Sequence, residues 1–494
     1  MDNKKQVSIK FNFIMNAILT MSTFIFPLIT FPYISRILLP EGTGRVSFAT
    51  SIVSYFAMIA QLGIPTYGIR ACAKVRDNKK KLSKTVHEIF TINIVMSTIA
   101  YVLFAMALCV VPKLRTDKVL MIIVSSTIFF NTIGMGWLFG ALEKYKYITI
   151  RSILFKFIAL LAMFVLIHQQ SDYVIYGGIS IFASSASNVC NFIYAHKFVD
   201  FHQKQKYEYR KHLKPILVFF AMSCATTIYT NLDTVMIGFI NGDTEVGFYN
   251  AAVKIKSILV CVVTSLGTVL LPRASYYVEH KMMDEFNRIT RKAINFVMLV
   301  AVPMVIYFML FAKEGIVFLS GNAYEPATIP MVIIMPTLLT IGLTNIMGIQ
   351  MLIPLGREKI VLYSEVVGAF VDLVINLMLI PRLASVGAAI GTLIAECSVW
   401  CVQYYALRDG VNKAYREISY WKIAIAVLAA SFCSLFIKRF QLSNFHVLII
   451  SAIIFFASYA FVLLVTREKM FMDTITEVIG GVLNKMKKKT DGAN

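Results

Sequence analysis

Basic residues alternate with apolar segments along this chain, and this alternation restricts the possible folds more than any other feature. The chain has 14 apolar segments of roughly 17–26 residues, which is the length that a helix needs to cross a hydrocarbon core of ~30 Å. Thirty-seven of the 48 Lys and Arg residues fall at the two ends or in every second gap, and nine fall in the other gaps. Such a bias places the basic gaps in the cytoplasm. The pattern predicts an all-α polytopic membrane protein with both ends in the cytoplasm.

The composition agrees with this fold class. The chain is 58% hydrophobic and only 15% charged, whereas a water-soluble protein needs a larger polar surface. In lipid each segment must satisfy its own backbone, so the segments are predicted to be helices. They lie at about 12–35, 46–67, 86–111, 119–141, 149–168, 173–195, 215–240, 248–271, 293–311, 329–354, 360–380, 387–407, 422–437 and 446–465. The gap that holds Lys144 to Lys156 counts as cytoplasmic.

The net charge of +21 does not require nucleic acid as a partner. The charge is dispersed over eight cytoplasmic pieces, and topology together with anionic lipid heads explains it. The eight Cys lie mostly inside segments and are interpreted as small apolar residues rather than metal ligands. The His residues show no ligand spacing, and no phosphate-binding Gly loop is present. The sequence therefore predicts neither a metal nor a cofactor.

A faint internal repeat relates the two parts of the chain. A shift of 203 positions places identical residues on each other: Ile34 on Ile237, Gly44 on Gly247, Ala49 on Ala252, Arg70 on Arg273 and Ala71 on Ala274. The shift carries the first two segments onto the seventh and eighth in the same orientation, so the repeat is parallel, with its axis along the membrane normal. We expect two six-helix bundles at 1–212 and 213–418. Two further helices and a basic cytoplasmic tail, predicted to be amphipathic or solvated, follow in 419–494.

Polar side chains recur at helical spacing on both repeated pairs of segments. They are Asn16, Thr20, Thr23, Pro27 and Thr30; Ser47, Ser51, Ser54, Gln61 and Pro65; Ser223, Thr226, Thr230 and Asp233; and Asn250, Lys254, Ser257, Thr264 and Thr268. Steps of three and four put each set on one side of its helix. A single polar stripe can simply hold helices together. Four stripes at matching positions favour the lining of a shared cavity.

Ionisable residues at membrane depth are costly and point to function. Asp233 and Lys254 come at similar depth on the two predicted cavity faces. They can form a structural ion pair, or Lys254 can bind an anionic substrate that Asp233 holds or releases. Lys256 lies ~200° around the helix from Lys254 and cannot share its face.

Acidic residues of the later segments are candidates for ion coupling. Glu365, Asp372 and Asn376 share one face, and Asp372 and Glu396 lie near the middle of the membrane. A carboxylate there can carry a coupling proton or sodium ion, or it can be protonated and hydrogen-bonded to a neighbouring helix. Glu88, near the inner end of its segment, is interpreted as a rim residue.

Arginines mark both predicted mouths of the cavity. Arg70 and Arg273 end equivalent helices on the cytoplasmic side, where anchoring at the interface is the usual role. The repeat also places them symmetrically, so they can attract a pyrophosphate. Arg36 and Arg45 flank the first outward turn and can act in the same way at the exit. The outward gaps are short, which leaves little room for a catalytic loop and favours moving a substrate over transforming it.

Several motifs resemble those of bacterial polysaccharide repeat-unit flippases of the Wzx type. They are FPYISRILLPEGTG at 31–44, LGIPTYGIR at 62–70, WLFGALEKYKYI at 137–148, and LDTVMIG at 232–238 followed by VGFYNAA at 246–252. Leu39 departs from the family pattern, in which Gly often precedes the Pro. Phe139-Gly140-Ala141 stands where Phe-Gln-Gly is frequent. The resemblance spans most of the chain and covers the first 275 residues most specifically.

This resemblance implies a member of the superfamily that also holds drug antiporters and lipid II flippases. It implies a cationic central cavity and alternating access driven by an ion gradient, H⁺ or Na⁺. The implied substrate is an undecaprenyl-pyrophosphate-linked oligosaccharide for capsule, O-antigen or teichoic acid, flipped across the cell membrane without enzymatic change. Membrane lipids, and a polymerase and glycosyltransferases of the same pathway, are the implied partners.

Two alternatives remain open. A multidrug or cation antiporter favours an acidic, aromatic cavity, against which Lys254 argues. Drug-resistance profiling of a deletion strain would distinguish this antiporter from a flippase. An integral membrane polymerase or ligase of glycan assembly predicts catalytic turnover of purified lipid-linked sugar, whereas a flippase leaves the sugar unchanged.

Overall fold

The computed structural model describes residues 9–201, 206–440 and 442–472, and this part is helical without a β-strand. Contacts divide the chain into two compact units. Unit 1 contains the described residues up to Asn250, with Ser320–Tyr324 and Asn376–Ser385. Unit 2 contains Ala251–Leu319, Glu325–Ile375 and the described residues from Val386 onward. The predicted bundles 1–212 and 213–418 stay predictions, and the predicted tail lies mostly outside the described residues.

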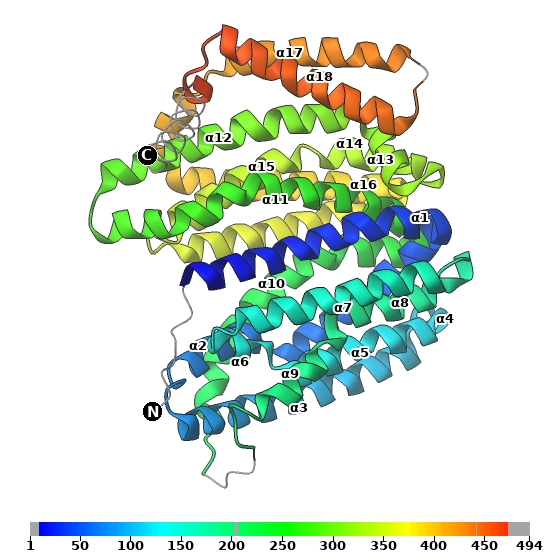
Figure 1. Ribbon diagram of the computed structural model, residues 1–494, viewed down its shortest axis with the longest axis vertical. Coiled ribbons are helices and arrows are strands. Elements are labelled where there is room, and N and C mark those ends of the chain that lie inside the picture. Colours follow the sequence, from blue (N-terminus) through cyan, green and yellow to red (C-terminus); the bar gives the residue numbers. More distant parts are fainter. Residues whose placement is uncertain (1–8, 202–205, 441, 473–494) are drawn as a thin grey trace, which may run out of the picture. The chain divides into compact units, whose positions relative to one another are not determined.

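Unit 1 is built around a long first helix. Its helices are α1 (Ile9–Gln61), α2 (Ile64–Ala73), α3 (Lys79–Val110), α4 (Pro112–Thr116), α5 (Lys118–Gly134), α6 (Gly136–Ala141), α7 (Tyr145–Leu166), η1 (Gln170–Asp172), α8 (Tyr173–Ile181), the π-helix η2 (Phe182–Ala186), α9 (Asn188–Ala195) and α10 (Arg210–Ile240). Helix α1 packs against α3, α5, α7, α8 and α10 (Figure 1). The unit thus places helices from both predicted bundles beside the first one.

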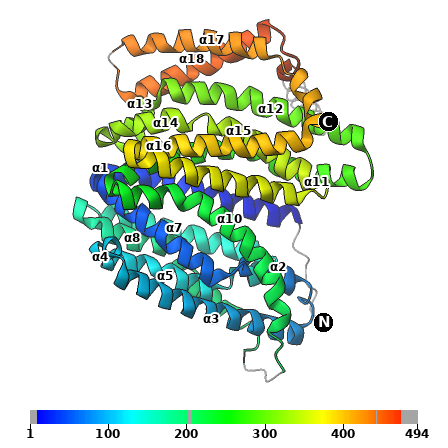
Figure 2. The same ribbon diagram turned by 180° about the vertical axis from the view of Figure 1, so that it is seen from behind.

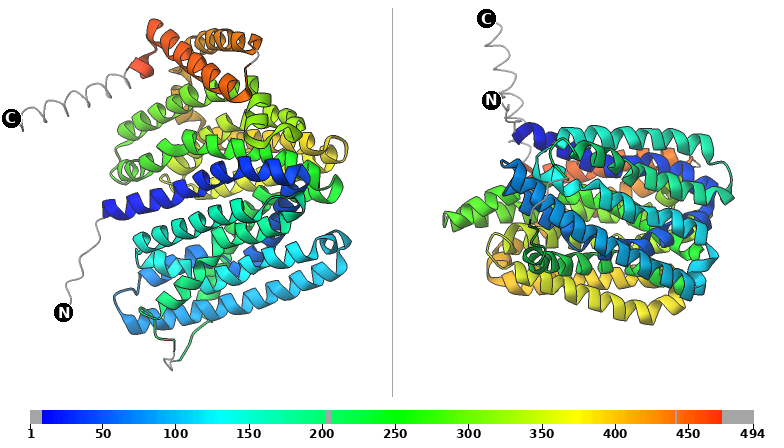
Figure 3. Two further views of the ribbon diagram at one scale, coloured as in Figure 1. Left: turned by 45° about the vertical axis from the view of Figure 1, so that its right-hand side comes forward. Right: turned by 90° about the horizontal axis from the view of Figure 1, so that it is seen from below.

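Unit 2 holds most of the later helices. They are α11 (Asp243–Glu279), α12 (Met283–Leu310), α13 (Ala312–Ser320), η3 (Asn322–Ala327), α14 (Thr328–Ile334), α15 (Thr337–Thr344), the π-helix η4 (Asn345–Leu352), α16 (Glu358–Arg416), α17 (Tyr420–Leu435), η5 (Phe436–Arg439) and α18 (Asn444–Val465). Helix α12 packs against α14, α15 and α17 (Figure 2). Helices α17 and α18 run side by side as a pair (Figure 3). Parts of α11, α13, η3 and α16 belong to unit 1.

The described residues contain nine helices that are long and apolar enough to cross a membrane, or ten if the bent pair Asn322–Ile334 and Thr337–Leu352 is one span. Apolar side chains also face outward, with Phe432 83% exposed and Trp421 81% exposed. Lipid solvates such surfaces, whereas water does not. The predicted polytopic fold is confirmed, and the number of 14 spans stays a prediction.

Two of these helices are bent and each contains two predicted segments. Straight, α1 would be ~80 Å long, far more than one span. It is bent at Leu39, which has φ 58° and ψ 176°. The following Pro40 disfavours helical dihedrals at Leu39 and removes a backbone donor. Helix α16 is bent at Ala384, which has φ 48° and ψ −125° and follows Pro381 by three residues.

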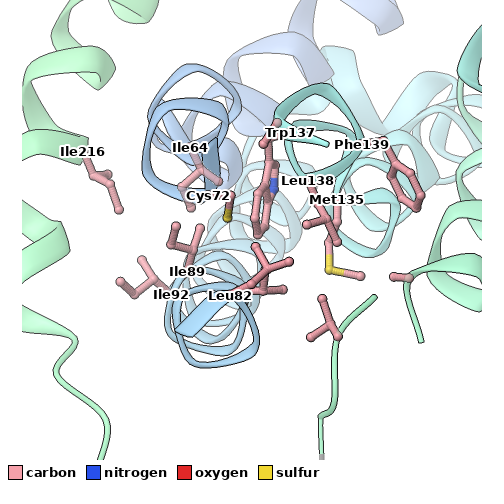
Figure 4. Packing of buried hydrophobic residues seen from close by; sticks show 14 of the residues in the cluster. Ile64, Cys72, Leu82, Ile89, Ile92, Met135, Trp137, Leu138, Phe139 and Ile216 are labelled. Carbon is pink, nitrogen blue, oxygen red and sulfur yellow. The ribbon is translucent and has the colours of Figure 1, made fainter. Parts of the chain in front are cut away.

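The motifs at 62–70 and 137–148 both contribute to one apolar cluster of unit 1. Figure 4 shows Ile64 and Cys72 of α2, Ile89 of α3 and Trp137 of α6 gathered together. A methyl group on Gly68 would lie 2.7 Å from the Trp137 ring, so only glycine allows this packing. The motifs at 62–70 and 137–148 are therefore two sides of the same contact.

Leu39 occupies a backbone region that is favourable only for glycine. We therefore expect glycine to be tolerated better than alanine at this position. Leu39→Gly should be more stable than Leu39→Ala by about 1–2 kcal/mol, because both lose the side chain and only glycine relieves the strain. At the neighbouring helical position the order should reverse, with Ile37→Gly less stable than Ile37→Ala by about 1 kcal/mol. Thermal unfolding midpoints of the four purified variants measure both differences, and equal stability of the two Leu39 variants would contradict the assignment.

Candidate functional site

Two glycine-containing segments of unit 1 approach each other in a reciprocal contact, defined by Pro40, Gly44, Asp243 and Gly247. A methyl group added to Gly44 would lie 1.7 Å from the backbone oxygen of Asp243. One added to Gly247 would lie 2.1 Å from the backbone oxygen of Pro40. The shift of 203 positions that relates Gly44 to Gly247 also relates Pro40 to Asp243. Each segment thus presents the same position to the other, as a local twofold axis requires.

The turn before each of these glycines has the same unusual backbone. Leu39 has φ 58°, and Gly242, which the shift pairs with it, has φ 94°. A positive φ at equivalent positions is rare for unrelated turns. This shared geometry supports the internal repeat at residue level, although the departure of Leu39 from the glycine of the family pattern concealed it in the sequence.

Side-chain bonds tie each of these two segments to another part of unit 1. The ammonium of Lys113 lies 2.9 Å from Oδ2 of Asp243. The hydroxyls of Thr43 and Tyr324 are 2.6 Å apart, and Tyr324 is completely buried. On the predicted topology all of these residues lie near the outer surface. Segment 243–247 is thus held to α4, and segment 40–44 is held to η3.

Asp233 lies buried at the centre of a polar cluster in unit 1. Tyr249 donates its hydroxyl to Oδ2 of Asp233, and Asn376 donates from Nδ2 to Oδ1 at 2.6 Å. The three residues come from α10, α11 and α16, so this carboxylate joins three helices. The sequence places Asp233 and Asn376 on polar faces, but it does not indicate that they meet.

Other predicted cavity residues differ in their surroundings. Asn250 is half-buried and donates to the Val246 carbonyl at 3.0 Å and to the Thr234 hydroxyl at 3.4 Å. Ser51 is buried, and Nε2 of Gln61 is buried without a hydrogen-bond partner among the described residues. Lys254 is half-buried in unit 2. Its pairing with Asp233 stays a prediction.

Three of the four predicted mouth arginines are exposed. Arg70, Arg273 and Arg36 are exposed, and Arg36 donates to the Pro32 carbonyl at 2.5 Å. Arg45 differs, because Glu41 at 2.7 Å and Asp117 at 3.0 Å both neutralise it. The accessible positions are compatible with anchoring and with anion attraction alike, so both roles stay predictions.

The coupling candidates lie on α16. Asp372 is buried, with an exposed fraction of 1%, and Asn376 follows it on the same buried helix face. Glu365 flanks this face and is half-buried. Glu396 is buried and interacts electrostatically with Glu365. Two of the three carboxyl groups are thus buried, and their part in ion coupling stays a prediction.

The interpretation of Glu88 as a rim residue is wrong, because Glu88 is completely buried. Its carboxylate accepts from the backbone N–H of Glu208 at 2.7 Å, from Lys211 at 2.9 Å and from Nε2 of His212 at 2.8 Å. Nδ1 of His212 lies 2.6 Å from the hydroxyl of Tyr67. This network joins α2, α3 and α10, and the sequence contains no spacing signal for it because its members are far apart in the chain.

Known proteins resemble this chain in sequence. A family model described as polysaccharide biosynthesis protein matches residues 9–278, and a model described as MatE matches residues 219–378. The chain is 26% identical over 414 residues to a protein of Escherichia coli K12 named putative O-antigen transporter. That alignment covers 82% of this chain and 98% of the relative.

Two solved structures share the fold. The lipid II flippase MurJ in an inward closed conformation has a TM-score of 0.73 at 12% identity, with 94% of this chain and 99% of that chain covered. An inward-facing multidrug MATE transporter of the MOP superfamily has a TM-score of 0.62 at 13% identity, with 82% and 99% covered. At such low identity the likeness shows the fold alone.

Proposed function

Because the chain belongs to the polysaccharide biosynthesis protein family, we propose that it flips a lipid-linked oligosaccharide across the cytoplasmic membrane. The predicted membership is confirmed, as is the predicted class of transport protein rather than enzyme. The proposed substrate is an undecaprenyl-pyrophosphate-linked unit of capsule, O-antigen or teichoic acid. The observation that carries the proposal is the near full-length similarity to a protein named as an O-antigen transporter.

The reciprocal contact supports alternating access. A carrier needs a closed side. The contact of Gly44 with Asp243 joins two predicted outer turns, and the Lys113–Asp243 ion pair ties a third predicted outer turn to them. We propose that these contacts separate when substrate leaves, and that an ion gradient drives the cycle. The proposed coupling groups are the carboxyl groups of Asp372 and Glu396, which are buried, and of Glu365, which is half-buried.

Reconstituted transport tests this function. Purified protein in vesicles should move a fluorescent lipid-linked oligosaccharide between leaflets, and the rate should rise when a proton or sodium gradient is imposed. The oligosaccharide recovered afterwards should be chemically unchanged. A polymerised or transferred sugar would instead indicate a polymerase or ligase. Resistance of a producing strain to cationic drugs, without flipping, would favour the antiporter, whose fold the MATE likeness also fits.

Lys254→Ala should lower the flipping rate at least tenfold with normal protein abundance, because a phosphate loses a charge-assisted bond. Lys256→Ala is the matched control, since it removes the same charge two positions away on a different face of α11 and should leave transport near wild type. Flipping in vesicles and surface polysaccharide in a complemented deletion strain are the two measurements. Normal transport by the Lys254 variant would remove this lysine from the substrate site.

A further inference from the structure

The first half of α1 and helix α7 run parallel in a constant register within unit 1. Thr149 donates to the Met15 carbonyl at 2.9 Å, Lys156 to the Ser22 hydroxyl at 2.8 Å, and Tyr33 to the Ile167 carbonyl at 2.8 Å. Each bond joins residues 134 positions apart. Residues 149–167 extend over ~27 Å, close to the thickness of a hydrocarbon core. Lys156 therefore lies near mid-membrane, and its assignment to a cytoplasmic gap is corrected.

Lys156 has a neutral partner at this depth. The Ser22 hydroxyl accepts from its ammonium while donating to the Leu19 carbonyl at 2.6 Å. No carboxylate pairs with Lys156 among the residues that the structure describes. An ammonium carries three donors, and a charge at the centre of a bilayer costs at least ~2.5 kcal/mol on insertion scales. Neither the charge nor two of the donors is accounted for by helix packing.

Arg151, the neighbouring cation on α7, makes contacts that are typical of a structural role. Arg151 donates to the Ser187 carbonyl at 2.9 Å, directly after the π-helix η2, and lies over the Tyr147 ring. A π-helix interrupts the regular backbone pattern, and Arg151 adds a donor to the carbonyl that follows it, which also accepts from the Cys190 N–H at 3.1 Å. Lys156 satisfies no backbone group in this way. It is also only half-buried, so its ammonium remains reachable.

We propose that Lys156 binds a phosphate of the lipid-linked substrate as it passes the middle of the membrane. The inference rests on the proposed function and adds a candidate phosphate-binding cation from the first half of the chain. A lysine ammonium suits a phosphate oxygen as a compact point charge. The neutral Ser22 hydroxyl orients the ammonium without neutralising it, so the charge is kept for the anion.

Binding of undecaprenyl diphosphate to purified protein, with uncharged undecaprenol as reference, tests this role. Lys156→Met should weaken diphosphate binding about tenfold or more and leave undecaprenol binding unchanged. Lys156→Arg should restore most of the affinity. Lys146→Met, which removes an exposed lysine from the same helix, is the matched control and should bind as wild type.

Ser22→Ala separates binding from a structural role, because it removes the same bond and keeps the charge. It should retain diphosphate binding within about threefold, even if Lys156→Met proves poorly folded. The assignment of Lys156 would be overturned by an equal loss of binding in Ser22→Ala and Lys156→Met, or by normal binding in Lys156→Met. Diphosphate binding by the wild-type protein would still support the proposed function in either case. Wild-type protein that does not prefer the diphosphate to undecaprenol would overturn both.

Discussion

Gly44→Ala is expected to destabilise the protein by about 2 kcal/mol or more, because the new methyl group would lie 1.7 Å from the backbone oxygen of Asp243. Atoms at that separation cannot coexist, and a backbone oxygen cannot rotate away as a side chain can. Segments 40–44 and 243–247 must therefore move apart or the unit must unfold. Folded yield in detergent and the midpoint of thermal unfolding are the measurements.

The reciprocal geometry sharpens this prediction. Gly247→Ala should cause a similar loss, since its methyl group would lie 2.1 Å from the Pro40 oxygen. Gly136→Ala is the control, because the methyl group there would meet no described atom within 4 Å beyond its chain neighbours and its own helix backbone. If only one of the two variants lost stability, the contact would not be reciprocal. Wild-type stability of both variants would show that the segments are not in contact.

Glu88→Ala is expected to cost about 3 kcal/mol or more, because it removes the acceptor for three donors of a buried network. Lys211 is partly exposed and can regain water, but the buried His212 and the Glu208 amide cannot do so easily. Glu88→Gln keeps an acceptor oxygen and should lose less. Thermal unfolding followed by tryptophan fluorescence measures the effect, since Trp137 packs in the adjacent cluster.

Glu208→Ala is the control for the carboxylate of Glu88. Its side chain is 59% exposed and makes ion pairs with Lys84 at 3.3 Å and Lys211 at 4.0 Å. Exposed pairs contribute little, so its loss should stay within about 0.5 kcal/mol. If Glu88→Ala melted at the wild-type temperature, the network would have no part in joining α2, α3 and α10.

The helices were largely predictable because each must satisfy its own backbone within the bilayer. Length and apolar composition then suffice to place them, and the described helices coincide broadly with the predicted segments. The bends at Leu39 and Ala384 were less accessible. A leucine with positive φ contradicts its local preference, so only contacts elsewhere in the fold can hold it there.

The candidate site was predictable in part. Depth along a helix follows from position, and it drew attention to Asp233, Asp372 and Lys254. The same criterion identifies Lys156, seven residues inside the segment predicted at 149–168, but the residue was counted with the basic gap before it. Position does not identify neighbours, so neither the Asn376–Asp233 bond nor the burial of Glu88 was foreseen.

The sequence by itself determined the membrane class, the approximate spans, the family and the transport function class, because these depend on properties local to each segment or on recognisable motifs. The tertiary structure alone decided which distant residues meet: Gly44 with Asp243, and Ser22 with Lys156. Such pairs are set by helix rotation and register, which depend on the packing of all neighbouring helices at once. No single segment encodes that packing, and it is what turns separate polar residues into a site.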